Sequence, residues 1–143
     1  RLTFIKRHDT NAVPTGLRQW FIVHFFVDVI FAIPLFFMTE TVLNIIGWPG
    51  IDPFAARLLA AALFGIGTES FLGRNGSKEL FHGMLNLKLI WSFFAVVGIV
   101  VTMITKPEYL NALAWATLFT FLFFLLLWSY WKLYLWRHVR GQY

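Results

Sequence analysis

Six polar side chains lie inside stretches of the sequence that are otherwise apolar, and they are the residues whose types could do chemistry. Carboxylates, imidazoles and amines can carry protons, hold a small ion or bind a polar head group. Because an ionisable group is costly in an apolar medium, each of them is a candidate for function. The six residues are His24, Asp28, Glu69, His82, Asn86 and Lys88.

The spacing of these residues indicates which of them could meet. His24 and Asp28 are four residues apart, and so are His82 and Asn86, so each pair shares one face of a helix. Lys88 is rotated by roughly 240° from His82 at about 100° per residue. Counted from the ends of their apolar stretches, Asp28 and Lys88 lie at about the same depth. All six residues belong to the same half of the predicted fold, the cytoplasmic one.

Three interpretations of this group stay open. In the first, Asp28 and Lys88 pair across helices and the other polar groups add modest interhelical hydrogen bonds. In the second, Asp28 and Glu69 exchange protons or bind a cation or polar head group in a pocket open to water. In the third, His24 and His82 ligate a metal, haem or a pigment, although no Glu-x-x-His or His-Glu-x-x-His spacing supports this.

The elements that must position these residues are four apolar segments of membrane-spanning length. They cover about residues 20–38, 53–72, 80–104 and 109–131, and a spanning helix needs about 20 apolar residues. None of them alternates like a strand of a membrane barrel, and the connections are short and rich in Gly and Pro. The sequence therefore predicts an all-α membrane protein, an up-down bundle of four transmembrane helices in a single domain, 1–143.

The composition indicates the same environment. Hydrophobic residues make up 59% of the chain and charged residues only 13%, whereas soluble domains carry about 25% charged residues. A cytosolic enzyme, a nucleic-acid-binding domain and a disordered tail are thereby excluded. The chain has no cysteine, which excludes disulfides, thiolate catalysis and cysteine-ligated metals.

The basic residues predict the orientation. The net charge of +5 reflects residues that gather on the cytoplasmic side of a membrane, and nucleic acid is not expected as a partner. Both termini, with residues 1–18 as an arm, are expected in the cytoplasm, and the location is expected to be a prokaryotic inner membrane. Trp128 is expected in the aromatic belt on the same side. Because the chain begins at Arg1, we expect it to be trimmed.

The opposite side of the membrane offers fewer signals. Arg57, near the outer start of the second segment, is expected to form a salt bridge with Asp52 or Glu40, with an anion site as the alternative. The connection 39–52 is expected to hold a short surface helix.

Two segments carry packing signals. In the second segment, Ala61 and Gly65 form a small-xxx-small pair, which predicts a central helix that holds Glu69 against its neighbours. The fourth segment is apolar all round before Lys132, which indicates contact with lipid or with another membrane protein.

Two stretches carry a resemblance to a known family. Residues 54–67 (FAARLLAAALFGIG), followed by Gly73-Arg74-Asn75, and residues 110–115 (LNALAW) resemble the DoxX-like four-helix bacterial membrane proteins. The resemblance implies a four-helix bundle with an arginine at the outer start of the second helix, and it implies no catalytic residue. Because some relatives are accessory subunits of membrane oxidoreductases, it also favours a subunit role.

No set of nucleophile, base and oxyanion-binding group can be assembled, so we expect no enzyme. The sequence predicts a non-catalytic integral membrane protein, an accessory or structural subunit of a larger membrane complex. Its expected partners are membrane lipid and other integral membrane subunits that contact the fourth helix. The alternatives are a small proton-coupled carrier or ion- or ligand-binding protein that uses the inner-half polar cluster, and a haem- or pigment-binding redox subunit. The sequence identifies no cofactor.

Overall fold

The computed structural model describes residues 13–140, which form helices and turns without any strand. Four long helices, each long and apolar enough to cross a membrane, confirm the four predicted spanning segments. Residues 1–12, most of the predicted arm, and residues 141–143 lie outside the described part. The elements are α1 (Thr15–Phe37), α2 (Thr39–Ile46), α3 (Pro53–Leu72), η2 (Gly73–Asn75), α4 (Lys78–Thr105), η3 (Pro107–Tyr109) and α5 (Ala112–Arg140).

The ends of the helices follow local signals in the sequence. Asp52 caps α3, because its carboxylate accepts from the backbone N–H groups of Phe54 at 3.0 Å and Ala55 at 3.1 Å. Pro53 occupies the first turn, where a missing N–H costs nothing. Ser77 caps α4 in the same way, with a longer bond of 3.4 Å to the N–H of Leu80. The fourth span begins at Ala112, later than predicted, because a proline-led turn, η3, precedes it.

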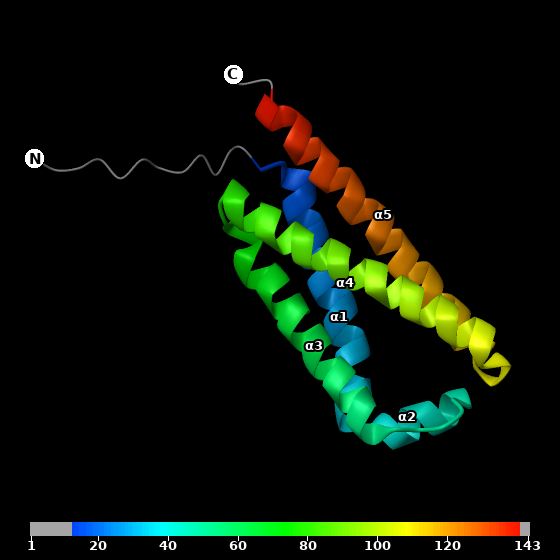
Figure 1. The fold of residues 1–143 in the computed structure, drawn as a ribbon. Coiled ribbons are helices and arrows are strands. Elements are labelled where there is room, and N and C mark those ends of the chain that lie inside the picture. Colours follow the sequence, from blue (N-terminus) through cyan, green and yellow to red (C-terminus); the bar gives the residue numbers. More distant parts are fainter. Residues whose placement is uncertain (1–12, 141–143) are drawn as a thin grey trace, which may run out of the picture.

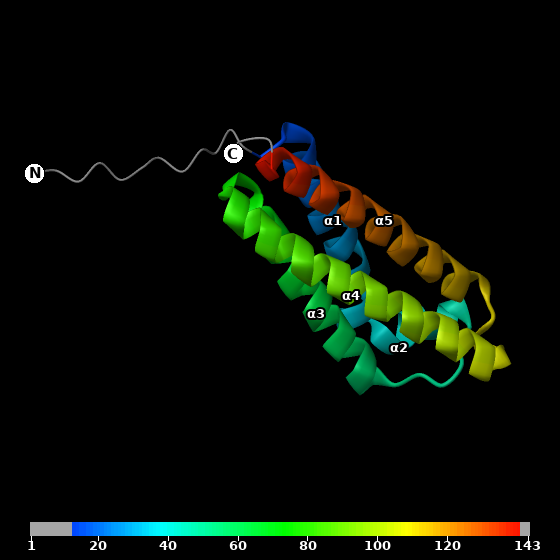
Figure 2. The same cartoon turned by 45° about the horizontal axis from the view of Figure 1, so that its top comes forward.

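The long helices pack as two pairs, α1 against α3 and α4 against α5. The start of α1, the end of α5 and the turn η2 gather at one end of the molecule, which we call the termini end (Figures 1 and 2). The two pairs meet there and diverge toward α2 (Figure 1). The four spanning helices therefore form a splayed bundle.

Large side chains explain where the pairs meet. Phe21, Phe81 and Trp128 are fully buried and come from α1, α4 and α5. Their rings touch: the Phe21 centroid lies 4.6 Å from that of Phe81 and 5.5 Å from that of Trp128. The core cluster around them consists of Val13, Leu17, Phe21, Phe81, Met84, Leu85, Phe124, Trp128 and Leu135.

A second, smaller core lies toward the α2 end, between α4 and α5. It is built from Met103, Ala114 and Leu118, and Trp48 from the loop after α2 packs against it. The ring of Trp48 lies 5.2 Å from that of Tyr109 in η3. The connection 39–52 therefore holds the predicted short helix and also carries a contact to the α4–α5 pair.

The predicted packing surface of α3 is wrong. Ala61 and Gly65 are exposed, and a Cβ added at Gly65 would meet no atom within 4 Å. The buried residues of α3 are Ala60, Gly67 and Ser70. At Gly67 an added Cβ would lie 2.8 Å from the Cβ of Asp28. The close approach of α1 to α3 therefore depends on this glycine, and α3 lies at the edge of the bundle.

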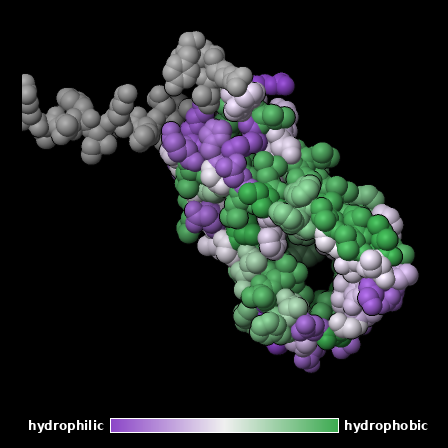
Figure 3. Space-filling model, viewed as in Figure 1, coloured by the Kyte–Doolittle hydropathy of each residue, from purple (hydrophilic) through white to green (hydrophobic). Residues whose placement is uncertain are grey.

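The surface is divided into bands. In the view of Figure 3, hydrophobic residues cover the middle of the molecule, and hydrophilic residues gather at the termini end and at the α2 end. Exposed side chains along the spans include Phe26, Ile30, Phe94 and Leu126. This distribution is typical of an integral membrane protein, whose apolar middle faces hydrocarbon.

Candidate functional site

A chain of buried polar side chains joins three of the four spanning helices. His24 and Asp28 come from α1, Ser70 from α3 and Lys88 from α4. Each is buried, and the most exposed of them, His24, shows only 7% of its surface. We call these four residues the buried polar cluster. Three of them are sequence-predicted candidates, and the structure brings those three together.

The contacts within the cluster form a line. Lys88 Nζ lies 3.1 Å from Nδ1 of His24 and donates to Oγ of Ser70 at 2.6 Å. The Ser70 hydroxyl in turn donates to the carbonyl of Ile66 at 2.7 Å. The same Nδ1 of His24 lies 3.0 Å from Oδ2 of Asp28. One ring nitrogen therefore contacts both an amine and a carboxyl oxygen.

Asp28 and Lys88 do not pair directly. No ion pair within 4.0 Å joins them in the described part of the chain, because both groups contact the same nitrogen of His24. Oδ2 of Asp28 is buried and lies 3.0 Å from that nitrogen. His24 therefore links the two charged groups of the cluster.

Aromatic rings from α1 and α5 enclose the cluster. Lys88 Nζ lies 5.0 Å from the ring centroid of Phe21 and 5.1 Å from that of Trp128, in cation–π range. The ring of Phe124 meets that of His24 edge-on at 4.7 Å. Trp128 is fully buried, so its predicted place in an interfacial belt is wrong. Its ring covers the cluster and also lies 5.3 Å from that of His24.

Ser70 is the member of the cluster that the sequence did not single out. Its neighbour Glu69 was predicted to line an inner pocket, but Glu69 is exposed. One residue turns the side chain by about 100°, which moves Glu69 off the face that meets α1. The sequence feature that could have identified Ser70 is its spacing from Gly67. The two residues are three positions apart, so they share the buried face of α3.

The other two inner candidates lie outside the cluster. His82 is half-buried, and its Nδ1 lies 3.0 Å from Nζ of Lys132 on α5. The same ammonium donates to the carbonyl of His82 at 3.2 Å. Asn86 is exposed on α4. His82 thus joins α4 to α5 separately, and Asn86 takes no part in either group.

The predicted outer salt bridge is not formed. Nε of Arg57 donates to the carbonyl of Phe36 at 3.2 Å, which ties α3 to the end of α1. The carboxylate of Asp52 accepts hydrogen bonds as the N-cap of α3, and Glu40 is exposed in the first turn of α2. Among the residues that the structure describes, Arg57 therefore bonds to a backbone carbonyl and to no carboxylate.

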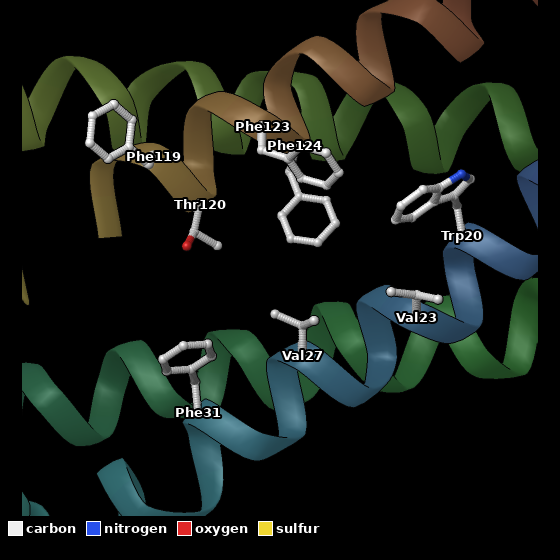
Figure 4. Close-up of a pocket in the computed structure, with 8 residues that line it drawn as sticks. All are labelled: Trp20, Val23, Val27, Phe31, Phe119, Thr120, Phe123 and Phe124. Atoms are coloured by element: carbon white, nitrogen blue, oxygen red, sulfur yellow. The ribbon is translucent and has the colours of Figure 1, made fainter. Parts of the chain in front are cut away.

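A groove of about 500 Å³ opens beside the cluster, between α1 and α5. Figure 4 shows the side chains of the two helices facing each other across it. Phe124 contributes to its wall and also touches His24, so one ring separates the groove from the cluster. The lining is almost entirely apolar and consists of Trp20, Val23, Val27, Phe31, Phe119, Thr120, Phe123 and Phe124.

A search for metal ligands finds no group of three or more His, Cys, Asp or Glu side chains close together in the part of the chain that is described. The buried polar cluster offers one imidazole, one carboxylate, one hydroxyl and one amine. This set suits the binding and transfer of protons better than the coordination of a metal, because an ammonium repels a cation. No family model, no curated protein and no solved structure matches the chain.

Proposed function

We propose that this chain is a small integral membrane protein that binds and passes a proton or a small ion through its buried polar cluster. The observation that carries the proposal is that one ring nitrogen of His24 contacts both the Lys88 amine and the Asp28 carboxyl group, in a cluster buried between three spanning helices. Ionisable residues that face the interior of a membrane bundle are typical of proton relays and ion pathways.

A purely structural cluster would be built differently. A buried ion pair stabilises a bundle only when good geometry and further hydrogen bonds offset the cost of desolvation. Here the carboxylate and the ammonium each contact His24, and no ion pair within 4.0 Å joins them in the described part of the chain. This arrangement favours a function in which the cluster takes up and releases a proton or a small ion.

The proposal includes the orientation and the location. We propose that the termini end faces the cytoplasm of a prokaryotic cell across its inner membrane. The basic side chains of Arg18, Arg74, Lys78 and Lys132 near this end support that orientation by the positive-inside rule. In this orientation the cluster exchanges its proton or ion with the cytoplasm.

The test is proton flux in liposomes that contain the purified protein and a trapped pH-sensitive dye. A potassium diffusion potential drives protons inward, and the internal pH is followed with time. We expect flux for the wild type, loss to the protein-free level for Asp28→Asn, and wild-type flux for Glu69→Gln. The control residue is a carboxylate of the same half that lies outside the cluster. Flux equal to protein-free liposomes in the wild type would refute the proposal.

The second candidate is an accessory subunit of a larger membrane complex. The observation that favours it is the apolar groove between α1 and α5, where the two helix pairs diverge and leave rings such as Phe119 and Phe123 exposed. The resemblance to DoxX-like proteins supports the same role. A helix of a partner subunit would fill this groove and complete the bundle.

Photo-crosslinking in native membranes tests the subunit role. A photoreactive amino acid replaces Phe119 in the groove, and a second variant carries it at Leu58, which is exposed on α3. We expect one discrete protein adduct from position 119 and only lipid adducts from position 58. If both positions yield lipid adducts alone, the accessory role is refuted.

A further inference from the structure

We propose that His24 is a transfer point for one proton between Lys88 and Asp28, which makes a proton, and not a metal cation, the ligand of the buried polar cluster. The inference rests on the proposed function of this cluster and names its ligand. It is carried by one atom: Nδ1 of His24 lies 3.1 Å from Nζ of Lys88 and 3.0 Å from Oδ2 of Asp28.

Nδ1 of His24 cannot accept a hydrogen bond from Lys88 and donate one to Asp28 at the same time. A neutral imidazole nitrogen either carries a hydrogen and donates or has a lone pair and accepts. When Nδ1 accepts from the Lys88 ammonium, the imidazole hydrogen is on Nε2 and Oδ2 of Asp28 has no donor. In the opposite case, when Nδ1 carries a hydrogen, Oδ2 of Asp28 lies 3.0 Å away as an acceptor.

Transfer of one proton from Lys88 to His24 gives the Asp28 carboxylate a hydrogen-bond donor. The Nζ–H bond of Lys88 that points at His24 breaks, its electron pair stays on Nζ, and an Nδ1–H bond forms. Lys88 becomes a neutral amine, and His24 becomes an imidazolium that lies beside the Asp28 carboxylate. The total charge of the cluster is zero before and after the step. Neither arrangement therefore adds a net charge to the interior, where an unpaired charge is costly.

No other titratable side chain that faces the cluster from α3, α4 or α5 in the described part of the chain takes part in this transfer. On α3 the facing group is Ser70, which accepts from Lys88, while Glu69 is exposed. On α5 the facing side chains are Phe124 and Trp128, which do not titrate. On α4 the nearest further titratable side chain, His82, is engaged with Lys132.

The packing of α3 leaves room for a proton but not for a coordinated ion. A Cβ added at Gly67 would lie 3.1 Å from Oδ2 of Asp28, so the α3 backbone is in close contact with the carboxylate. Hard cations need a shell of several oxygen ligands, whereas the cluster presents one carboxyl group and one hydroxyl beside an amine. A proton needs only a single lone pair.

Nitrogen-15 NMR of the full-length protein labelled at histidine tests the transfer, because Nδ1 resonates as a pyrrole-type nitrogen with a proton and as a pyridine-type nitrogen without one. We expect Lys88→Met to move the His24 signal to the pyrrole type, because the proton then faces only Asp28. Asp28→Asn should move it to the pyridine type. The wild type should lie between the two, and Glu69→Gln should match the wild type.

Three controls accompany this measurement. The signals of His82 and His138 in the same spectra report whether each variant is folded, and Ser70→Ala is a second variant that should shift Nδ1 in the same direction as Lys88→Met. Exchange of choline for Na⁺ should leave the spectrum unchanged. The proposal is overturned if the Lys88 and Asp28 variants move Nδ1 the same way or not at all, or if Na⁺ shifts it. Absence of flux with opposite shifts would refute transport and leave the proton transfer standing.

Discussion

Lys88 shows how one charged residue is accommodated inside an apolar bundle. Its ammonium contacts the imidazole of His24, donates to the hydroxyl of Ser70 and lies over the rings of Phe21 and Trp128. Each contact replaces part of the hydration that the ammonium loses on burial. The carboxylate of Asp28, which contacts the same nitrogen of His24, supplies the opposite charge. The members of the cluster therefore depend on one another.

This dependence predicts a non-additive effect on stability. Asp28→Asn leaves the Lys88 charge buried without compensation and should cost about 3–5 kcal/mol of unfolding free energy. The double variant Asp28→Asn/Lys88→Met removes both charges and should recover most of that loss. Tryptophan fluorescence during denaturant unfolding in detergent measures both values. A double variant that is less stable than either single variant would contradict this account.

At the scale of elements, the contact between α1 and α3 is set by one glycine. Gly67 faces the Cβ of Asp28 directly, whereas Gly65, two residues away, faces open surroundings. The same helix thus offers a substitution and its matched control. The difference depends on the rotation of α3 about its axis, which brings position 67 toward α1.

Gly67→Ala should destabilise the protein by about 1–3 kcal/mol, because the new methyl group forces α1 and α3 apart. Gly65→Ala should cost nothing and should add up to about 1 kcal/mol through helix propensity. Thermal unfolding of the two variants in the same detergent compares them. Equal losses at both positions would mean that α3 is not oriented as described.

The N-terminus of α3 provides a second test at this scale. If Asp52 acts as a helix cap, Asp52→Ala should cost about 1 kcal/mol, whereas Asp52→Asn should be nearly neutral because Asn caps equally well. If Asp52 instead formed the salt bridge with Arg57, both substitutions would lose the same interaction. Unfolding free energies of the two variants, with Glu40→Gln as a control, separate these cases.

At the scale of the whole molecule, the two helix pairs share a core at the termini end and a lighter contact at the α2 end. The first consists of the aromatic cluster around Phe21, Phe81 and Trp128, and the second of the Trp48–Tyr109 contact. Between them lies the apolar groove. The cluster of His24, Asp28, Ser70 and Lys88 therefore lies close to where the pairs join.

The orientation of the whole molecule is tested by labelling, which the absence of native cysteine makes direct. Single cysteines replace Asn75 in η2 and Glu108 in η3. In intact cells, a membrane-impermeant maleimide should label position 108 and leave position 75 unlabelled until the cells are opened. The reverse pattern would place the termini end outside and would invert the proposed direction of exchange.

The sequence by itself determined the four spanning helices, the short helix after the first span and three of the four members of the buried cluster. It could do so because long apolar runs, caps such as Asp52 and ionisable residues within spans are local features that act whatever the chain packs against. The sequence did not show that Asp28 and Lys88 meet through His24, that Ser70 is buried and Glu69 exposed, or that Gly67 is the packing glycine. These features depend on the rotation of each helix about its axis and on the splay of the two pairs. Only the tertiary structure decided these, because a turn of one residue moves a side chain by about 100° and exchanges a buried partner for an exposed one.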